Sequence, residues 1–329
     1  MKGAFVISLD FELYWGVRDS KSMETYKERI LGVREVIPAL LNLFKEFNIH
    51  ATFASVGLLT FEDKETLLQH MPKEASTFTN TAYNIEPTYL KELGNSEIED
   101  PFHFGFTLLK QIQASEKHEI ASHTFTHYYT LEEGATLDYF KADIEAYKTR
   151  TNELEIQLDT IIFPRNQFNV DYLNVCKEAG FIGYRGTEKN WMYRPISRKK
   201  ETIIRRLARL ADSYINISGM HCYDWTRLRD KNGLYNIPSS RFLRPYSHRL
   251  RAFEYLRLKR IKNAMTHAAI NEEIFHLWWH PHNFGKDIKQ NIGFLRSILE
   301  HQQTLLKIYG FESRTMGKCY SIINSYEQR

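Results

Sequence analysis

The sequence predicts an α/β protein whose parallel sheet curls into a barrel. Strand-like and helical segments alternate along its 329 residues, and polar residues follow several of the predicted strands. Such alternation is typical of a parallel sheet, and barrels of parallel strands carry their active residues at the carboxyl ends of the strands. We therefore expect one catalytic domain spanning residues 1–329.

The expected elements follow from residue type and apolar spacing. Strands are predicted at 3–11, 51–56, 117–121, 160–163, 181–184 and 274–279. Helices are predicted at 23–47, 136–158, 171–179 and 288–309. Residues 60–116 interrupt the alternation with short helical patterns, and we interpret them as an insertion over the active site.

The first predicted strand ends in two carboxylates, Asp10 and Glu12. Because side chains alternate faces along a strand, both acids share one face. Buried acids cost desolvation energy unless a cation or hydrogen bonds compensate their charge. The pattern therefore leaves two interpretations open, a cation site or a pair of solvated acids at a strand end.

Two imidazoles follow later, His123 and His127. A helical turn would place both on one side, with β-carbons about 5–6 Å apart. Two neutral imidazoles and a carboxylate can hold one zinc ion and leave a position open for water. The spacing alone is a weak indication, because many such pairs are ordinary core or surface residues.

Five short stretches of the chain, taken together and in order, resemble the motifs of a known family. They lie at 9–12 (LDFE), 37–57, 118–127 (HEIASHTFTH), 163–166 (FPRN) and 276–283 (HLWWHPHN). In order and in residues they resemble the NodB-like polysaccharide deacetylases, carbohydrate esterases that remove N- or O-acetyl groups from sugars. The resemblance is specific at 118–127 and loosest at 163–166. It implies a distorted (β/α) barrel of the polysaccharide deacetylase type with a helical insertion.

The resemblance also implies a role for each polar residue. Asp10 would be the general base, Arg165 the partner that orients it, and His280 the general acid. The implied cofactor is a divalent metal, zinc first, with cobalt, nickel or manganese as alternatives. Its ligands would be Glu12, His123 and His127.

The chain departs from the family pattern at three points. The family usually has an aspartate where this chain has Glu12, and the longer arm must shift the metal or bind it differently. Arg165 follows a proline instead of preceding one. His282 competes with His280 for the role of acid, and the alternative for both is a structural strand end packed by tryptophans.

These groups predict a metal-dependent hydrolase acting on an acetylated sugar. A metal would polarise the acyl oxygen and acidify water, Asp10 would accept the proton of that water, and a histidine would protonate the leaving amine. Deformylation of a formamido sugar would use the same groups. A catalytically inactive relative that binds glycan is the alternative from another class.

Positive charge is concentrated in residues 194–262, which carry eighteen Lys and Arg against five Asp and Glu, while the whole chain has a net charge of +4. Such a region could face a nucleotide or lipid pyrophosphate, an acidic glycan or a membrane. An amphipathic helix near 250–265, packed on the barrel with its basic residues solvated, is the plainer interpretation. No nucleic-acid-binding motif accompanies the charge, so no nucleic-acid partner is expected.

No apolar stretch approaches the roughly 18 residues of a spanning helix, and the first strand begins without the apolar region of a signal peptide. We therefore expect a cytoplasmic protein, peripheral to the membrane if the basic region touches it. The expected substrate is a glycan precursor, either a small nucleotide-linked sugar or a lipid-linked one, in surface-polysaccharide synthesis.

Overall fold

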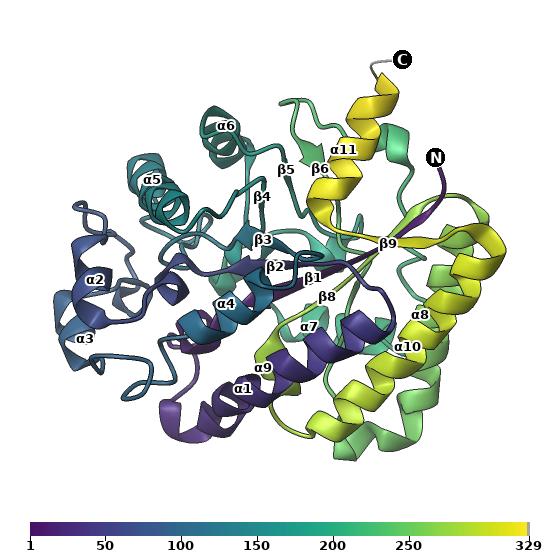
Figure 1. Cartoon of the computed structure of the whole chain (residues 1–329), viewed down its shortest axis with the longest axis horizontal. Helices are drawn as coiled ribbons and strands as arrows, with labels where there is room; N and C mark the ends of the chain where they lie inside the picture. The colour runs from purple at the N-terminus through teal and green to yellow at the C-terminus, as the bar shows by residue number, and fades with distance from the viewer. Residues whose placement is uncertain (328–329) are drawn as a thin grey trace.

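The computed structural model describes residues 1–327, and its centre is a sheet of nine parallel strands. The strands are β1 (Ala4–Phe11), β2 (Ala51–Ser55), β3 (Glu119–Ser122), β4 (Thr160–Ile161), β5 (Gly183–Tyr184), β6 (Tyr235–Asn236), β7 (Arg241–Phe242), β8 (Ile274–Trp279) and β9 (Glu312–Arg314). They run in the order β6-β5-β4-β3-β2-β1-β8-β7, with β9 also paired to β1. The predicted α/β class with a parallel, curled sheet is confirmed (Figure 1).

Helices flank the sheet, most of them on its outer side. They are α1 (Met23–Glu46), α2 (Lys64–Gln69), α3 (Pro87–Glu92), α4 (Phe106–Gln113), α5 (Leu137–Glu153), α6 (Val170–Glu178), α7 (Ile203–Asp212), α8 (Glu254–Ile270), α9 (Pro281–Phe284), α10 (Ile288–Tyr309) and α11 (Met316–Glu327). Figure 1 shows α1, α10 and α8 along one flank and α5 beside α6 along another. The predicted long helices are confirmed, and α7 and α11 were not predicted.

Strand β1 fixes the position of the candidate acids because it is the most extensively paired strand. It pairs with β8 on one side and, on the other, with β9 over its first half and with β2 over its second half. Phe5, Ile7 and Leu9 pack in the larger hydrophobic core with the outer helices, whereas Val6 belongs to a smaller interior cluster. Alternation along the strand therefore places Asp10 on the interior face, as predicted.

The basic region contains α8, which covers most of the predicted helix near 250–265. The expectation that its basic residues are solvated is wrong for Arg257 and Arg260, which are only 2% and 4% exposed. Arg257 pairs with Glu254 and stacks on the ring of Phe294 at 3.8 Å from its centroid. A buried guanidinium needs such partners to offset its desolvation. Within residues 1–327, no helix has the length and apolar character needed to cross a membrane.

Candidate active site

Asp10 is buried at the carboxyl end of β1 and is held by Arg185, which follows β5. The guanidinium donates two hydrogen bonds to the carboxylate, Nη1 to Oδ1 at 2.7 Å and Nη2 to Oδ2 at 2.8 Å. Burial alone would raise the pKa of Asp10, but the Arg185 charge and the neighbouring imidazoles outweigh it and lower the pKa. Asp10 is therefore an ionised carboxylate with a fixed orientation.

The predicted contact between Arg165 and Asp10 does not form. Arg165 instead pairs with Asp19 and with Glu132, and its guanidinium lies over the ring of Tyr129 at 3.9 Å from the centroid. Arg165 lies in a short 3₁₀ turn, Pro164–Asn166, with a φ of 55°. The assignment of Arg165 as the residue that orients Asp10 is wrong on this geometry.

Arg185 is the residue that sequence reasoning missed. The loose arginine motif still contributes, because Asn166, next to Arg165, accepts a hydrogen bond from Arg185 Nη2 at 2.8 Å. A third partner is Ser8, whose Oγ accepts from Nη1 at 3.0 Å. The available signal was the position of Arg185 directly after a predicted strand, where side chains of a parallel sheet converge.

The two arginines can be separated by matched substitutions. We expect Arg185→Gln to lower turnover about 100-fold, the effect of misplacing a catalytic group by about 1 Å. Arg165→Gln removes the same charge from a neighbouring ion pair and should lower turnover less than tenfold. Steady-state kinetics on both variants, with circular dichroism to confirm folding, tests this. Equal losses in the two variants would contradict the assignment of Arg185.

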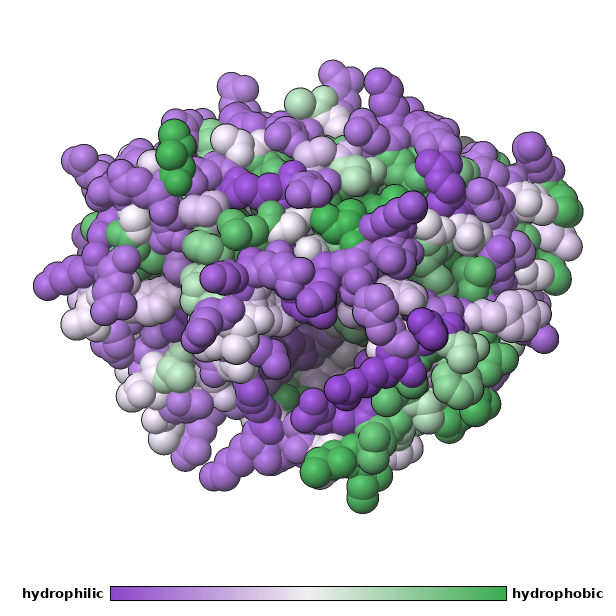
Figure 2. All heavy atoms as spheres, turned by 90° about the horizontal axis from the view of Figure 1, so that it is seen from below, coloured by the Kyte–Doolittle hydropathy of each residue, from purple (hydrophilic) through white to green (hydrophobic). Residues whose placement is uncertain are grey.

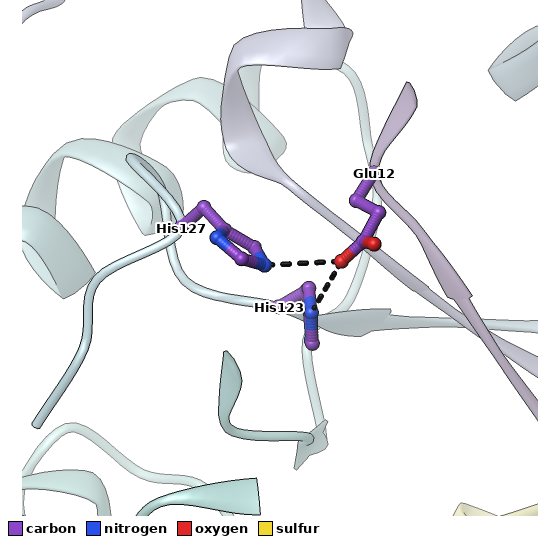
Figure 3. Close-up of side chains that lie close together, drawn as sticks. All are labelled: Glu12, His123 and His127. Atoms are coloured by element: carbon purple, nitrogen blue, oxygen red, sulfur yellow. Dashed lines mark hydrogen bonds and ion pairs between the residues drawn. The ribbon is translucent and has the colours of Figure 1, made fainter. Parts of the chain in front are cut away.

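Glu12 lies between two imidazoles that approach the same carboxylate oxygen. Its Oε2 is 3.0 Å from His127 Nε2 and 3.3 Å from His123 Nε2 (Figure 3). Nδ1 of His123 donates to the carbonyl of Ile162 at 2.8 Å, an arrangement that leaves the lone pair on Nε2. The three predicted ligands therefore converge, and all three are buried.

The electrostatics of this group suit a cation. Burial alone would raise the pKa of Glu12, but the imidazole of His280 and those of the histidine pair hold it well below its usual range. Burial lowers the pKa of His127, which keeps that ring neutral. A carboxylate beside two imidazoles is the donor set that zinc and similar divalent ions bind in hydrolases. The residues present thus fit a divalent metal.

The two histidines lie on a loop, not on the helical turn that their spacing suggested. Thr124 and His127 have φ values of 61° and 58°. Asp143 of α5 holds this loop by accepting hydrogen bonds from the backbone N–H groups of Phe125 at 2.7 Å and Thr126 at 2.8 Å. Burial raises the pKa of Asp143 to about 6. The loop brings the two rings to 5.0 Å between centroids.

Gly16 makes room for the longer arm of Glu12. It ends the short 3₁₀ helix η1 (Leu13–Gly16), and a β-carbon there would lie 1.9 Å from Glu12 Cδ. The departure from the family's aspartate is therefore accommodated by a neighbouring residue without a side chain. No such compensation is visible in the spacing of the acids alone.

We expect Gly16→Ala to displace the Glu12 carboxylate and to weaken zinc binding by about 100-fold or more, since ligand positioning alone is worth 10- to 100-fold. Competition with a chromophoric chelator measures the affinity. Gly293→Ala is the matched control, because a β-carbon at Gly293 meets nothing within 4 Å. Unchanged zinc affinity in Gly16→Ala would mean that Glu12 does not bind the ion.

His280 and His282 both approach Glu12, but from different environments. His280 Nε2 lies 3.7 Å from Asp10 Oδ2 and 3.6 Å from Glu12 Oε1, and its Nδ1 lies 3.2 Å from Asn283 Oδ1. His282 is buried with Nδ1 3.7 Å from Glu12 Oε1, and burial lowers its pKa to about 3. His280, which lines a cavity, is the more accessible of the two.

His276 is a structural residue of β8. Its Nδ1 donates to the carbonyl of Ile237 at 3.0 Å, and its Nε2 is 2.8 Å from Ser8 Oγ. Burial lowers its pKa to about 3, so the ring stays neutral. Ser8 Oγ also accepts the hydrogen bond from Arg185, so His276 is linked to the Arg185 guanidinium through Ser8. This link gives a structural role to the buried histidine at the start of the late motif.

A family model matches part of the chain. The model for polysaccharide deacetylases matches residues 25–183, including the loop that carries the two histidines. Over these residues the chain is similar to the polysaccharide deacetylase family. A search of curated proteins finds no match.

Solved structures with this fold differ widely from this chain in sequence. A Mycobacterium smegmatis protein classed as a polysaccharide deacetylase aligns with a TM-score of 0.60 at 12% identity, covering 99% of this chain and 92% of its own. A Pseudomonas aeruginosa PAO1 protein of the same class aligns at 0.54 and 12%, covering 97% and 89%. PuuE allantoinase aligns at 0.53 and 11%, covering 97% and 88%. At these identities the likeness concerns the fold, and the predicted distorted barrel of the deacetylase type is confirmed.

Proposed function

We propose that this protein is a metal-dependent hydrolase that removes the acetyl group from an amide of a sugar. The observation that carries the proposal is the convergence of Glu12, His123 and His127 beside an ionised Asp10. Metal-assisted amide hydrolysis needs a general base and a metal site close together. Here the base is a carboxylate oriented by an arginine, and three potential metal ligands lie beside it. O-acetyl groups would be cleaved by the same residues.

A divalent ion would be held by Glu12, His123 and His127. When bound, it supplies a Lewis acid that polarises the acyl carbonyl and acidifies water. Zinc is the first choice for a set of two imidazoles and one carboxylate, with cobalt, nickel or manganese as alternatives. A second cluster, in which Glu12 meets His280 and His282, lies on the other carboxylate oxygen.

The chain's own groups divide the proton transfers. Asp10 accepts the proton of the attacking water, and Arg185 fixes the orientation of the Asp10 carboxylate. His280 donates a proton from Nε2 to the leaving amine, because an amine anion is a very poor leaving group. A hydrogen bond between its Nδ1 and Asn283 Oδ1 would fix the orientation of the ring, with Nε2 toward Asp10 and Glu12.

The function is tested by acid release from acylated sugars. Purified protein loaded with zinc is incubated with N-acetyl, O-acetyl and N-formyl sugars, and acetate or formate is measured. If formate is released in preference to acetate, the proposed reaction is deformylation and not deacetylation. A protein that takes up no divalent ion, even from excess zinc or cobalt, and releases neither acid would instead be a glycan-binding relative.

The proposed substrate is a glycan precursor made near a membrane surface. Support comes from α7, whose residues Ile203, Ile204 and Leu207 are 74%, 73% and 58% exposed in an otherwise basic region. Figure 2 shows hydrophobic residues gathered beside a hollow whose border is hydrophilic. Exposed apolar residues among cations complement an anionic bilayer. Peripheral contact of α7 with such a bilayer is part of the proposal.

We expect the protein to sediment with phosphatidylglycerol vesicles and less with phosphatidylcholine vesicles. Ile204→Asp should reduce binding about tenfold, since burying one such side chain is worth about 1.5–3 kcal/mol. Ile308→Asp is the matched control, because Ile308 is similarly exposed on α10. Equal binding by the two variants would refute contact through α7.

A further inference from the structure

A cavity of about 500 Å³ adjoins the catalytic centre, and arginines dominate its lining. Eight arginines and only two carboxylates border it. Its inner end reaches Trp278 and His280, and His280 lies 3.7 Å from Asp10. A molecule whose acyl group lies at Asp10 would therefore extend into this cavity.

Some of these arginines are already neutralised. Arg241 pairs with Asp212, and Arg209 lies 3.1 Å from Glu201. The Asp212 carboxylate also accepts a hydrogen bond from Tyr193 at 2.7 Å. These pairs build the wall of the cavity and need no ligand.

Other arginines have no such partner. Arg205 and Arg244 are partly buried, and neither forms an ion pair with a carboxylate in residues 1–327. Arg244 donates from Nε to Ser213 Oγ at 2.7 Å, while Arg205 donates to backbone carbonyls. Burial lowers the pKa of both arginines. Glu201 lies near enough to Arg205 to offset part of its charge, whereas none of the described residues places a carboxylate near Arg244. A desolvated cation of this kind favours an anionic ligand.

A second observation indicates a ligand that also bears hydroxyl groups. Glu188 lines the same cavity, is only 4% exposed and accepts a hydrogen bond from Ser239 at Oε2. Its Oε1 is buried and has no hydrogen-bond partner among the described residues. A sugar hydroxyl would satisfy this oxygen. Burial raises the pKa of Glu188, so its negative charge opposes an anion less than that of an ordinary glutamate.

We propose that this cavity binds a phosphate or diphosphate group attached to the sugar whose acyl group is removed. The inference rests on the proposed function and specifies its substrate class. Arginine forks match phosphate oxygens in pairs, and phosphate carries more charge than a carboxylate. Arg194 and Arg206 are exposed and would attract the anion to the cavity, whereas the partly buried Arg244 would donate hydrogen bonds to it.

Binding of pyrophosphate tests the site without reference to catalysis. Isothermal titration of the full-length protein is run with and without a chelator, which separates binding through a metal ion. We expect binding that persists in chelator and weakens about tenfold in Arg244→Gln, the loss of one or two charge-assisted hydrogen bonds. Arg194→Gln, at an exposed position where folding is not at risk, should weaken it about threefold. Arg251→Gln, an exposed arginine outside the cavity, is the control.

Three outcomes of this titration would overturn the proposal. They are no binding in chelator, equal affinity in Arg244→Gln and Arg251→Gln, and tighter binding of glucuronate than of pyrophosphate. Because none of them involves acid release, the site can fail while deacetylation stands. Conversely, arginine-dependent binding without any acid release would retain the site and refute the proposed reaction.

The source of the phosphate is resolved by kinetics. The same acetylated sugar is supplied bare, as a nucleotide diphosphate and as a polyprenyl diphosphate in detergent. We expect Arg244→Gln to lower kcat/KM about tenfold more for the phosphorylated forms than for the bare sugar. The form with the higher kcat/KM identifies the carrier as nucleotide or lipid. Equal losses in all three forms would contradict the proposal.

Discussion

Asp10→Asn should lose turnover by at least about 100-fold and still bind one divalent ion. Asparagine keeps the shape of the side chain but cannot accept a proton from water, and general base catalysis contributes about 10²–10⁴-fold. The ligands on Glu12, His123 and His127 are untouched by the change. Acid release and metal content, measured on the same preparation, check both parts of the expectation.

The substitution also leaves Arg185 buried without its counter-charge. Losing one partner of a buried ion pair costs about 3–5 kcal/mol of the free energy of unfolding, so the assay belongs at a temperature where the variant is folded. Ser8→Ala is the control, since it removes a hydrogen bond to Arg185 but keeps the ion pair. Turnover near that of the wild type in folded Asp10→Asn would exclude Asp10 as the base.

His123→Ala should abolish stable metal binding and, with it, nearly all turnover. Removing one of three ligands is expected to weaken zinc by more than the roughly 100-fold that a supporting hydrogen bond costs. Metal analysis after dialysis measures the bound ion. Zinc should raise the Tm of the wild type and leave that of the variant unchanged, because only binding to the folded state stabilises it.

His282→Ala is the informative comparison for this variant, because His282 belongs to the second cluster around Glu12. We expect it to retain the ion, since Nε2 of His123 and of His127 lie closer to Glu12 than Nδ1 of His282 does. Loss of the ion from His282→Ala, with retention in His123→Ala, would move the site to the second cluster. His280 would then be a ligand, and the acid would have to be another residue.

The parts of the fold that were predicted are those with strong local patterns. Strand β1 is a continuous apolar run, and α10 was predicted with the bounds that the structure has, Ile288–Tyr309. Unlike the equally short β4 and β5, strands β6, β7 and β9, with two or three residues each, were not predicted. They form only because neighbouring strands are already in place, so their sequence carries little signal. The role of residues 60–116 as an insertion over the site stays a prediction.

In the candidate site, too, the residues that were predicted are those that follow from a local pattern. Alternation along β1, a local rule, gives the face of Asp10, whereas Glu12 lies just beyond the strand at the start of η1. Arg165 was chosen over Arg185 because the choice depends on backbone direction at one strand end, which residue order does not encode. The burial of Arg257 and Arg260 likewise depends on a neighbouring ring and on carbonyl groups from distant segments.

The pairing of β1 with three other strands has a consequence for how the protein would lose activity on warming. The carboxylates of Asp10 and Glu12 are anchored to the segment whose amides should open only when the entire molecule unfolds. The imidazoles of His123 and His127 lie instead on a loop, which is held by Asp143 and by backbone hydrogen bonds with residues 55–58. On mild heating the loop that carries His123 and His127 should therefore become mobile first. Affinity for the metal ion should then fall at a lower temperature than the one at which the barrel unfolds.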